Sequence, residues 1–393
     1  MTPSNKSPRS KVFFWYDPFW RGIIYQLTTL LLVGLIGFYL FSNVQANLDR
    51  QKIATGFGFL GKEASFEIGE SLISYSSADV YAKALLVGVL NTIKVSFVGI
   101  VLTVILGTFI GIARLSSNWL VSKIAGIYIE LFQNIPILLQ LFFFYALFYE
   151  VFPSPQKALH PMQGVFITNR GIDIAVPVWQ QTHLFMALAF LIGCILIYIV
   201  SRWSRQRQEK TGQTFPVFYL ALAVLIGLPL TTWAIFGAPT AMSVPALQGF
   251  NFEGGYNLSP EFGALLIGLV LYTAAFVAEV VRAGIQSISE GQTEAAMSIG
   301  LKPGQVTKLV ILPQALRVII PPLTSQMLNL TKNSSLAVAI GYPDFVAVAG
   351  TSINQTGQAI EGVAMIMLVY LTFSLSTSAF MNWYNKKIAL VER

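Results

Sequence analysis

The stretch Glu294-Ala-Ala-Met-Ser-Ile-Gly300, followed after nine residues by Val310-Ile-Leu-Pro313, lies between two apolar segments, 259–281 and 314–340. Each segment is long enough, at about 20 residues or more, to cross a lipid bilayer as a helix. The stretch between them must therefore lie at a membrane surface. It predicts a membrane protein with a short, structured loop outside the bilayer.

The loop carries the signals of a short helix over 290–299. Ser289 is available as the N-cap, and Glu290 lies in the first turn, where a negative charge is favourable. Gly300 predicts the C-cap, and Pro303 prevents a simple continuation of the helix.

One face of this short helix is predicted to be small and apolar. Ala295, Ala296 and Ile299 have spacings that place them on a common helical stripe. Two alanines let the backbone of another protein approach closely. The pattern therefore favours a helix that docks into a groove of a partner.

The composition of the whole chain is that of a membrane protein. Apolar residues make up 54% and charged residues 11% of the 393 residues, whereas a soluble domain carries about 25% charged residues. The net charge of +7 is spread between apolar segments, which does not indicate nucleic-acid binding. Cys194 is the single cysteine and cannot form an internal disulfide, and the two histidines lack partners at metal-ligand spacing.

Apolar segments long enough to span a bilayer recur eight times, so the sequence predicts an all-α polytopic membrane protein with about 8 transmembrane helices. The seventh is the least regular, because Pro321-Pro322 and Gly341 interrupt it. The predicted spans are 22–41, 84–112, 124–149, 183–201, 215–236, 259–281, 314–340 and 360–383.

Basic residues alternate in number from one loop to the next. Because cytoplasmic loops carry the excess of Lys and Arg, the richer set predicts that both termini and the 294–313 loop are cytoplasmic. The richer set comprises Lys6, Arg9, Lys11, Arg21, Arg114, Lys123, Arg202, Arg205, Arg207, Lys210, Arg282, Lys302, Lys308, Arg317, Lys386, Lys387 and Arg393. The poorer set comprises Arg50, Lys52, Lys62, Lys83, Lys157 and Arg170.

The Glu-Ala-Ala pattern resembles the "EAA loop" of the membrane subunits of bacterial ABC importers, with Val310 in place of an isoleucine. Further stretches resemble the polar amino-acid (histidine/glutamine) permease family, although Gln133-Asn134 stands where that family more often has Arg-Gly. These stretches are Leu86-Val-Gly-Val-Leu-Asn-Thr92, Gly111-Ile-Ala-Arg114, Tyr128 to Ile137, Ala278-Glu-Val-Val-Arg-Ala-Gly284, Leu312-Pro-Gln-Ala315 and Lys332-Asn-Ser-Ser-Leu336.

The resemblance implies the fold of an ABC importer (type I) permease, with a core of five helices over 83–150 and 259–388. Residues 1–82 then add a cytoplasmic tail, an extra first transmembrane helix and an extracytoplasmic segment. Residues 151–258 form an insertion with two transmembrane helices, and 259–393 hold the second core part with the docking loop 290–313. Stretches 54–60 and 67–71 are similar to the long permeases of general L-amino-acid importers, in which two different permeases pair.

The same resemblance implies function, location and partners. The chain is expected to be the permease subunit of an amino-acid importer in the bacterial inner membrane, and not an enzyme. It has no GxxxxGK[ST] phosphate loop, so ATP and Mg belong to a separate cytoplasmic ATPase dimer. An extracytoplasmic amino-acid-binding protein, a second, related permease and membrane lipid complete the expected partners. The expected ATPase-coupling residues are Glu290, Gly291, Glu294, Ala295, Ala296, Gly300, Leu312 and Pro313.

Charged residues inside predicted spans are functional candidates, because burying a charge in hydrocarbon is costly. Glu279 and Arg282, three residues apart, either pair with each other or contact the substrate. Lys94 either snorkels to the interface or has a role in transport.

A polar cluster in the seventh span is the candidate transport path. Lys332 begins it, and Asn333, Ser334 and Ser335 follow. A zwitterionic amino acid needs a cation or a helix N-terminus for its carboxylate and acceptors for its amine.

Two other functional classes remain open at this stage. An ion-coupled secondary amino-acid transporter usually shows inverted repeats, of which there is no clear sign, and leaves the 294–313 loop unexplained. A membrane enzyme would need a triad, a metal cluster or paired carboxylates within the spans, and none is apparent.

Overall fold

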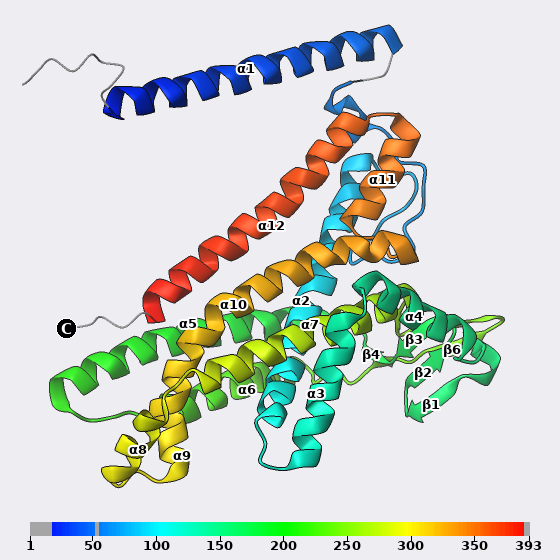
Figure 1. Cartoon of the computed structure of the whole chain (residues 1–393). Helices are drawn as coiled ribbons and strands as arrows, with labels where there is room; N and C mark the ends of the chain where they lie inside the picture. The colour runs from blue at the N-terminus through cyan, green and yellow to red at the C-terminus, as the bar shows by residue number, and fades with distance from the viewer. Residues whose placement is uncertain (1–17, 52–54, 389–393) are drawn as a thin grey trace, which may run out of the picture. The chain divides into compact units, whose positions relative to one another are not determined.

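The computed structural model describes residues 18–51 and 55–388 and divides the chain into two compact units. Residues up to 91 together with 343–375 form the first unit, and the rest forms the second. Figure 1 shows the elements. The basic residues Lys6, Arg9, Lys11, Lys52 and Arg393, and the side chains of Lys386 and Lys387, lie outside what is described.

The first unit contains α1 (Pro18–Gln51), the start of α2 (Tyr81–Arg114), α11 (Phe345–Thr356) and the start of α12 (Ala359–Ile388). Its buried core comprises Phe59, Ala64, Tyr81, Ala84, Leu85, Phe345, Val348 and Ala349. The Asn91 amide ties this unit together, because Nδ2 donates to the Glu70 carbonyl at 2.8 Å and to the Pro343 carbonyl at 2.9 Å.

The second unit is organised around α7 (Pro260–Gln286), which packs against α3 (Trp119–Asn134), α4 (Ile137–Glu150) and α10 (Leu312–Asn333). Glycines of α7 permit close packing. A Cβ atom at Gly268 would lie 2.6 Å from Leu141 of α4, and one at Gly284 would lie 2.3 Å from Ile319 of α10. The predicted insertion, 151–258, contains the helix pair α5 (Gln181–Thr211) and α6 (Val217–Ile235), which pack against each other.

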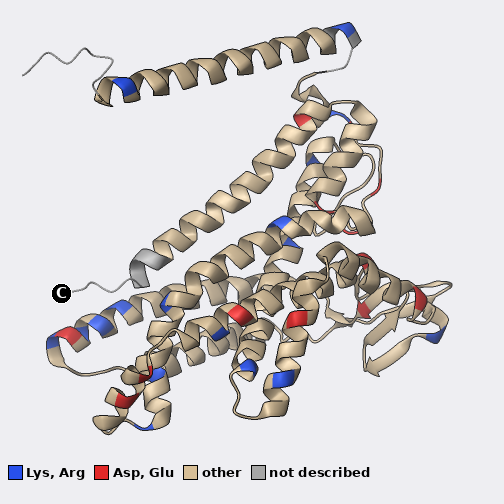
Figure 2. Ribbon diagram, viewed as in Figure 1, with Lys and Arg blue, Asp and Glu red and all other residues tan. Residues whose placement is uncertain are grey.

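The apolar helices agree with the predicted spans. Seven helices of the described residues are long and apolar enough to cross a membrane, or eight if a bent pair counts as one span. Charged residues lie mostly near helix ends, and the blue ribbon segments of Figure 2 show basic residues along the last turns of α5. The prediction of a polytopic, mainly helical protein is confirmed.

The third predicted span is the exception, because 124–149 is not one helix. It consists of parts of α3 and α4, which are bent by 104° at Ile135 and Pro136. Pro136 has no N–H to continue the ladder of hydrogen bonds. The buried Gln140 side chain compensates for this, because Nε2 donates to the Phe132 carbonyl at 3.0 Å and to the Ile135 carbonyl at 2.9 Å.

The seventh predicted span is more regular than expected. Helix α10 continues through Pro321 and Pro322, so the prediction that they interrupt it was wrong. Gly341 does end the segment: it follows a 3-10 helix over Ser334–Ile340 and has a φ of +81°.

Eight short strands accompany the helices in the part of the chain that the structure describes, and none of them was predicted. The larger sheet is antiparallel in the order β1 (Leu159–Met162), β2 (Val165–Thr168), β3 (Gly171–Ile174) and β8 (Tyr256–Leu258). Two smaller pairs join β4 (Val176–Pro177) to β5 (Met242–Ser243) and β6 (Ala246–Gln248) to β7 (Asn251–Glu253). Because β3 pairs with β8, the segments before α5 and after α6 meet at the same end of the second unit.

Candidate functional site: the loop between α7 and α10

The predicted docking loop forms a short helix, α8 (Glu290–Ser298), which packs against α9 (Pro303–Val306) and a π-helical turn over Thr307–Ile311. Ser289 has extended N-cap dihedral angles and its carbonyl accepts from the Gln292 N–H at 3.1 Å, but its side chain makes no capping hydrogen bond. The N-cap position was therefore predicted, whereas the side-chain cap is absent. Glu290 lies in the first turn, as expected.

Gly300 ends α8 with a complete C-terminal motif. The Gly300 N–H donates to the Met297 carbonyl at 2.9 Å, and the Leu301 N–H donates to the Ala296 carbonyl at 3.3 Å. These are the two hydrogen bonds of a Schellman motif, which requires a left-handed residue after the helix. Gly300 supplies it with a φ of +86°, and the space where its Cβ would stand is open.

The three residues of the predicted apolar face differ in their exposure. Ala296 is buried, whereas Ala295 is exposed and Ile299 is 78% exposed. The three residues therefore do not form one exposed face. Helix α8 packs on α9 and the π-helical turn, and one of the three residues is buried. Ile299 and Met297, which is 49% exposed, lie outside every apolar span of the described residues.

The acidic and small residues of the loop are accessible. Glu290, Gly291 and Glu294 are exposed, and neither carboxylate forms an ion pair within the residues that the structure describes. The two charges are thus available to basic groups of another chain.

Leu312 and Pro313 have a different position from the α8 residues. They begin α10 directly after the π-helical turn. The regular α-helical hydrogen bonds are interrupted at Pro313, because proline has no backbone N–H and its ring clashes with the carbonyl four residues earlier. The Gln314 side chain donates from Nε2 to the Val310 carbonyl at 3.0 Å and to Gln292 Oε1 of α8 at 3.5 Å. This contact joins the base of α10 to α8, and no spacing in the sequence signals it.

The two charged residues near the end of α7 form an ion pair. Both Nε and Nη2 of Arg282 donate to Glu279 Oε2, at 2.9 and 2.7 Å, and Nη1 donates to Gln286 Oε1 at 2.8 Å. Both side chains are about one third exposed. This geometry assigns the pair to the surface of the helix bundle, next to the loop that leads to α8.

The polar cluster of the seventh span does not converge on one point. Ser334 is fully buried and its hydroxyl donates to the Thr331 carbonyl at 2.7 Å, while the Ser335 hydroxyl donates to the Lys332 carbonyl at 2.7 Å. Both hydroxyls therefore serve the backbone where α10 becomes a 3-10 helix. Lys332 is exposed and Asn333 is half-buried, so these two keep their polar groups accessible.

Lys94 of α2 makes polar and aromatic contacts at the end of the unit that holds the sheet. Its Nζ donates to the Tyr256 hydroxyl at 2.7 Å and lies 4.2 Å from the centre of the Phe262 ring. These contacts satisfy the ammonium group within the protein. The snorkelling interpretation stays a prediction.

A bundle of long apolar helices with a capped, exposed helix between two of them defines the architecture of a multi-span membrane protein. Residues 210–390 match the family described as the binding-protein-dependent transport system inner membrane component. The chain is 48% identical over 379 residues to the general L-amino acid transport system permease protein AapQ of Rhizobium johnstonii, covering 96% of this chain and 94% of that protein.

Another relative covers a similar share of the chain. The glutamate/glutamine/aspartate/asparagine transport system permease protein BztB of Rhodobacter capsulatus is 40% identical over 412 residues, covering 96% of each chain. The chain therefore belongs to the amino-acid permeases among the inner membrane components of binding-protein-dependent ABC transport systems.

Proposed function

We propose that this chain forms one half of the membrane pathway of an amino-acid importer in the bacterial inner membrane. A second, related permease forms the other half, a cytoplasmic ATPase dimer holding ATP and Mg supplies the energy, and an extracytoplasmic binding protein delivers the substrate. The observation that carries the proposal is the similarity to AapQ over nearly the whole of both chains. The chain itself is a permease and not an enzyme, and family membership leaves the ion-coupled alternative without support.

Helix α8 is the proposed contact with the ATPase. Met297 and Ile299 offer exposed apolar groups outside the spans, and Glu290 and Glu294 offer carboxylates that form no ion pair among the described residues. An apolar helix in a groove with charges at its rim is a recurring mode of recognition. Pro313 and the π-helical turn hold the base of α10 against α8, so movement of α8 would be passed directly to a transmembrane helix.

The geometry of the second unit supports both termini on one side of the membrane. Helix α2 runs in the same direction as α7, since the Cβ positions of Gly99 and Gly111 adjoin Leu266 and Ala278 respectively. Arg114 at the end of α2 therefore lies at the α8 end of the unit. Helix α4 finishes at the opposite end, where Phe148 adjoins Gly263 near the start of α7.

The bent pair α3 and α4 thus passes from the α8 end to the sheet end. This supports its count as one broken span, for a total of eight. An even number of crossings returns the chain to its starting side. With the excess of basic residues at the α8 end, that side is the cytoplasm and the strands are extracytoplasmic.

The proposed transport path lies in the core, beside α10, with Lys332 and Asn333 as its accessible polar groups. Helices α5 and α6 are assigned to the periphery. They pack mainly on each other, and α6 has no buried residue within its described length, which suits contact with lipid.

Reconstitution tests the proposed function and the pairing together. The chain should be purified in lipid nanodiscs with its ATPase, either alone or with the second permease, and the binding protein added. We expect amino acids to raise ATP hydrolysis only when both permeases are present, because one chain presents one α8 helix to an ATPase dimer with two grooves. Stimulation of a homodimer to the same rate would contradict the pairing, and failure of the complete set would contradict amino-acid import.

Thiol labelling tests sidedness and path in one background, Cys194→Ser, which removes the exposed native cysteine. A membrane-impermeant maleimide should modify Gln163→Cys in the β1–β2 turn from outside the cell and Ser116→Cys after α2 only from inside. Substrate should protect Ser335→Cys and leave Tyr198→Cys in α5 unprotected. Protection confined to α5 would move the path into the insertion.

A further inference from the structure

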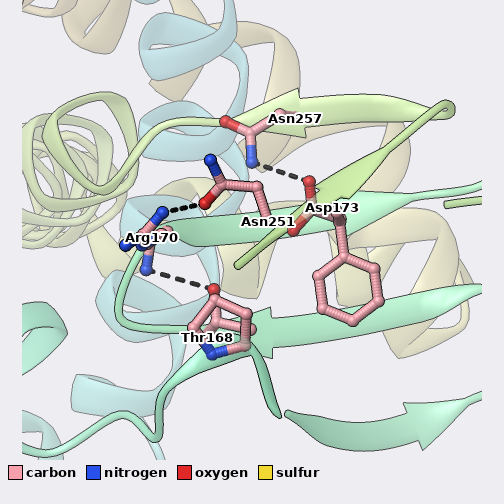
Figure 3. Close-up of a pocket in the computed structure, with 7 residues that line it drawn as sticks. Thr168, Arg170, Asp173, Asn251 and Asn257 are labelled. Carbon is pink, nitrogen blue, oxygen red and sulfur yellow. Dashed lines mark hydrogen bonds between the residues drawn. The ribbon is translucent and has the colours of Figure 1, made fainter. Parts of the chain in front are cut away.

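The extracytoplasmic end of the second unit contains a polar cavity that no transport step described above uses. It has a volume of about 330 Å³, and its lining comprises Pro155, Thr168, Arg170, Asp173, Asn251, Phe252 and Asn257. Figure 3 shows the polar residues of this group around the cavity, brought together from β2, β3, β7, β8 and the β2–β3 turn. The size is that of a small-molecule site.

Asp173 forms the acidic part of the cavity. It is 3% exposed, in the middle of β3, and directly opposite Asn257 of β8. The Asn257 amide donates to Oδ1 at 2.7 Å, while Oδ2 accepts no hydrogen bond from the part of the chain that the structure describes. Burial raises the pKa of this carboxyl, and the Asn257 hydrogen bond offsets only part of that effect. A cationic ligand group at Oδ2 would favour the ionised form.

Arg170 forms the basic part. It belongs to the two-residue turn between β2 and β3, and its backbone N–H donates to the Thr168 hydroxyl at 3.1 Å. Arg170 is exposed, and its Nη1 donates to Asn251 Oδ1 of β7. The turn is held against β8 by Gly171, since a Cβ there would lie 2.3 Å from the Leu258 carbonyl oxygen.

The two charges face the same cavity without pairing. No ion pair between Arg170 and Asp173 forms among the residues described, and each is held instead by an asparagine. An opposite pair kept apart in this way matches a ligand that carries both charges, an anion for the guanidinium group and a cation for the carboxylate.

We propose that this cavity is an extracytoplasmic binding site for a zwitterionic α-amino acid, with Arg170 holding the carboxylate and Asp173 the ammonium group. The inference rests on the proposed function for the class of ligand. Such a site lies outside the spans and would retain substrate at the outer face of the permease, separately from the path beside α10.

Binding is measured by titration calorimetry on the full-length chain with its partner permease in nanodiscs, without the binding protein. L-Glutamine is the probe, and two analogues test the charges without altering the protein. Glutaramic acid lacks the α-amine and 4-aminobutanamide lacks the α-carboxylate. We expect each analogue to bind at least about tenfold more weakly, which is the usual effect of losing one hydrogen-bonded charge. Equal binding of all three compounds would overturn the proposal.

Two variants and two matched controls then locate the binding. Arg170→Gln and Asp173→Asn should each weaken glutamine binding about tenfold or more. Lys157→Gln and Glu253→Gln remove exposed charges at the same end of the unit but outside the lining, and should leave binding unchanged. Wild-type affinity in both pocket variants would place any binding elsewhere.

Measurement of uptake by the complete importer distinguishes failure of the proposed amino-acid site from failure of the proposed import function. If the wild-type importer takes up amino acids while the pocket variants bind glutamine normally, the pocket assignment fails and the import function stands. If the wild-type importer takes up no amino acid, the proposed function itself fails.

Discussion

Gly300→Val is expected to leave the chain in the membrane and to lower amino-acid uptake by more than tenfold. The Gly300 Cβ position is open, so the substitution creates no clash with another residue. Its cost comes from the backbone, because a β-branched residue at a φ of +86° is strained by about 1–3 kcal/mol. That strain is relieved by opening the Schellman turn, which displaces Ile299 and Leu301 and disrupts the proposed contact with the ATPase.

Gly304→Val is the matched control. It lies in the same loop, its Cβ position is also open, and its φ is not positive. Valine is slightly better than glycine within a helix, so this variant should retain uptake. Uptake is measured with labelled amino acid in cells, and the amount of each variant is measured in isolated membranes. Full uptake by Gly300→Val would contradict the role of α8 in coupling.

Gly107→Ala is expected to destabilise the permease. Replacing glycine by alanine in a helix with free space around that position normally has the opposite effect. A Cβ at Gly107 would lie 2.6 Å from the Val277 Cβ and 2.9 Å from the Ala274 carbonyl oxygen, so α2 and α7 would have to separate. Overpacking of this kind costs about 1–3 kcal/mol, which exceeds the gain of about 1 kcal/mol from replacing a helical glycine. Gly107→Val should prevent accumulation of folded protein.

Gly227→Ala in α6 is expected to stabilise the permease, the opposite effect to Gly107→Ala, since nothing lies within 4 Å of the Gly227 Cβ position. It should raise the midpoint of thermal unfolding in detergent, while Gly107→Ala lowers it. A rise in both midpoints would show that α2 and α7 are not in close contact. The two glycines are indistinguishable in the sequence, because each lies inside a long apolar segment.

The class of protein and the place of the α8 loop could be predicted from the amino-acid sequence. Apolar segments of about 20 residues have few alternatives to membrane helices, since backbone polar groups in lipid must be satisfied within the helix. The position of Gly300 was also readable, because a left-handed residue after a helix strongly favours glycine. These features depend on neighbours along the chain.

The exposure of each residue of α8 and the meeting of distant polar groups depend on three-dimensional packing and could not be predicted from the sequence. Ala296 is buried and Ile299 exposed because α9 and the π-helical turn cover one side of α8, which helical spacing alone does not reveal. Pro136 lies at a sharp bend between two helices, whereas Pro321 and Pro322 lie inside a continuous helix. Each proline removes one backbone hydrogen bond of a helix, and the surrounding contacts decide whether the helix bends there. Arg170 and Asp173 share a cavity with Asn251 and Asn257. They meet because β3 pairs with β8, which lies more than eighty residues later in the chain. Such long-range pairing produces no local periodicity in the sequence.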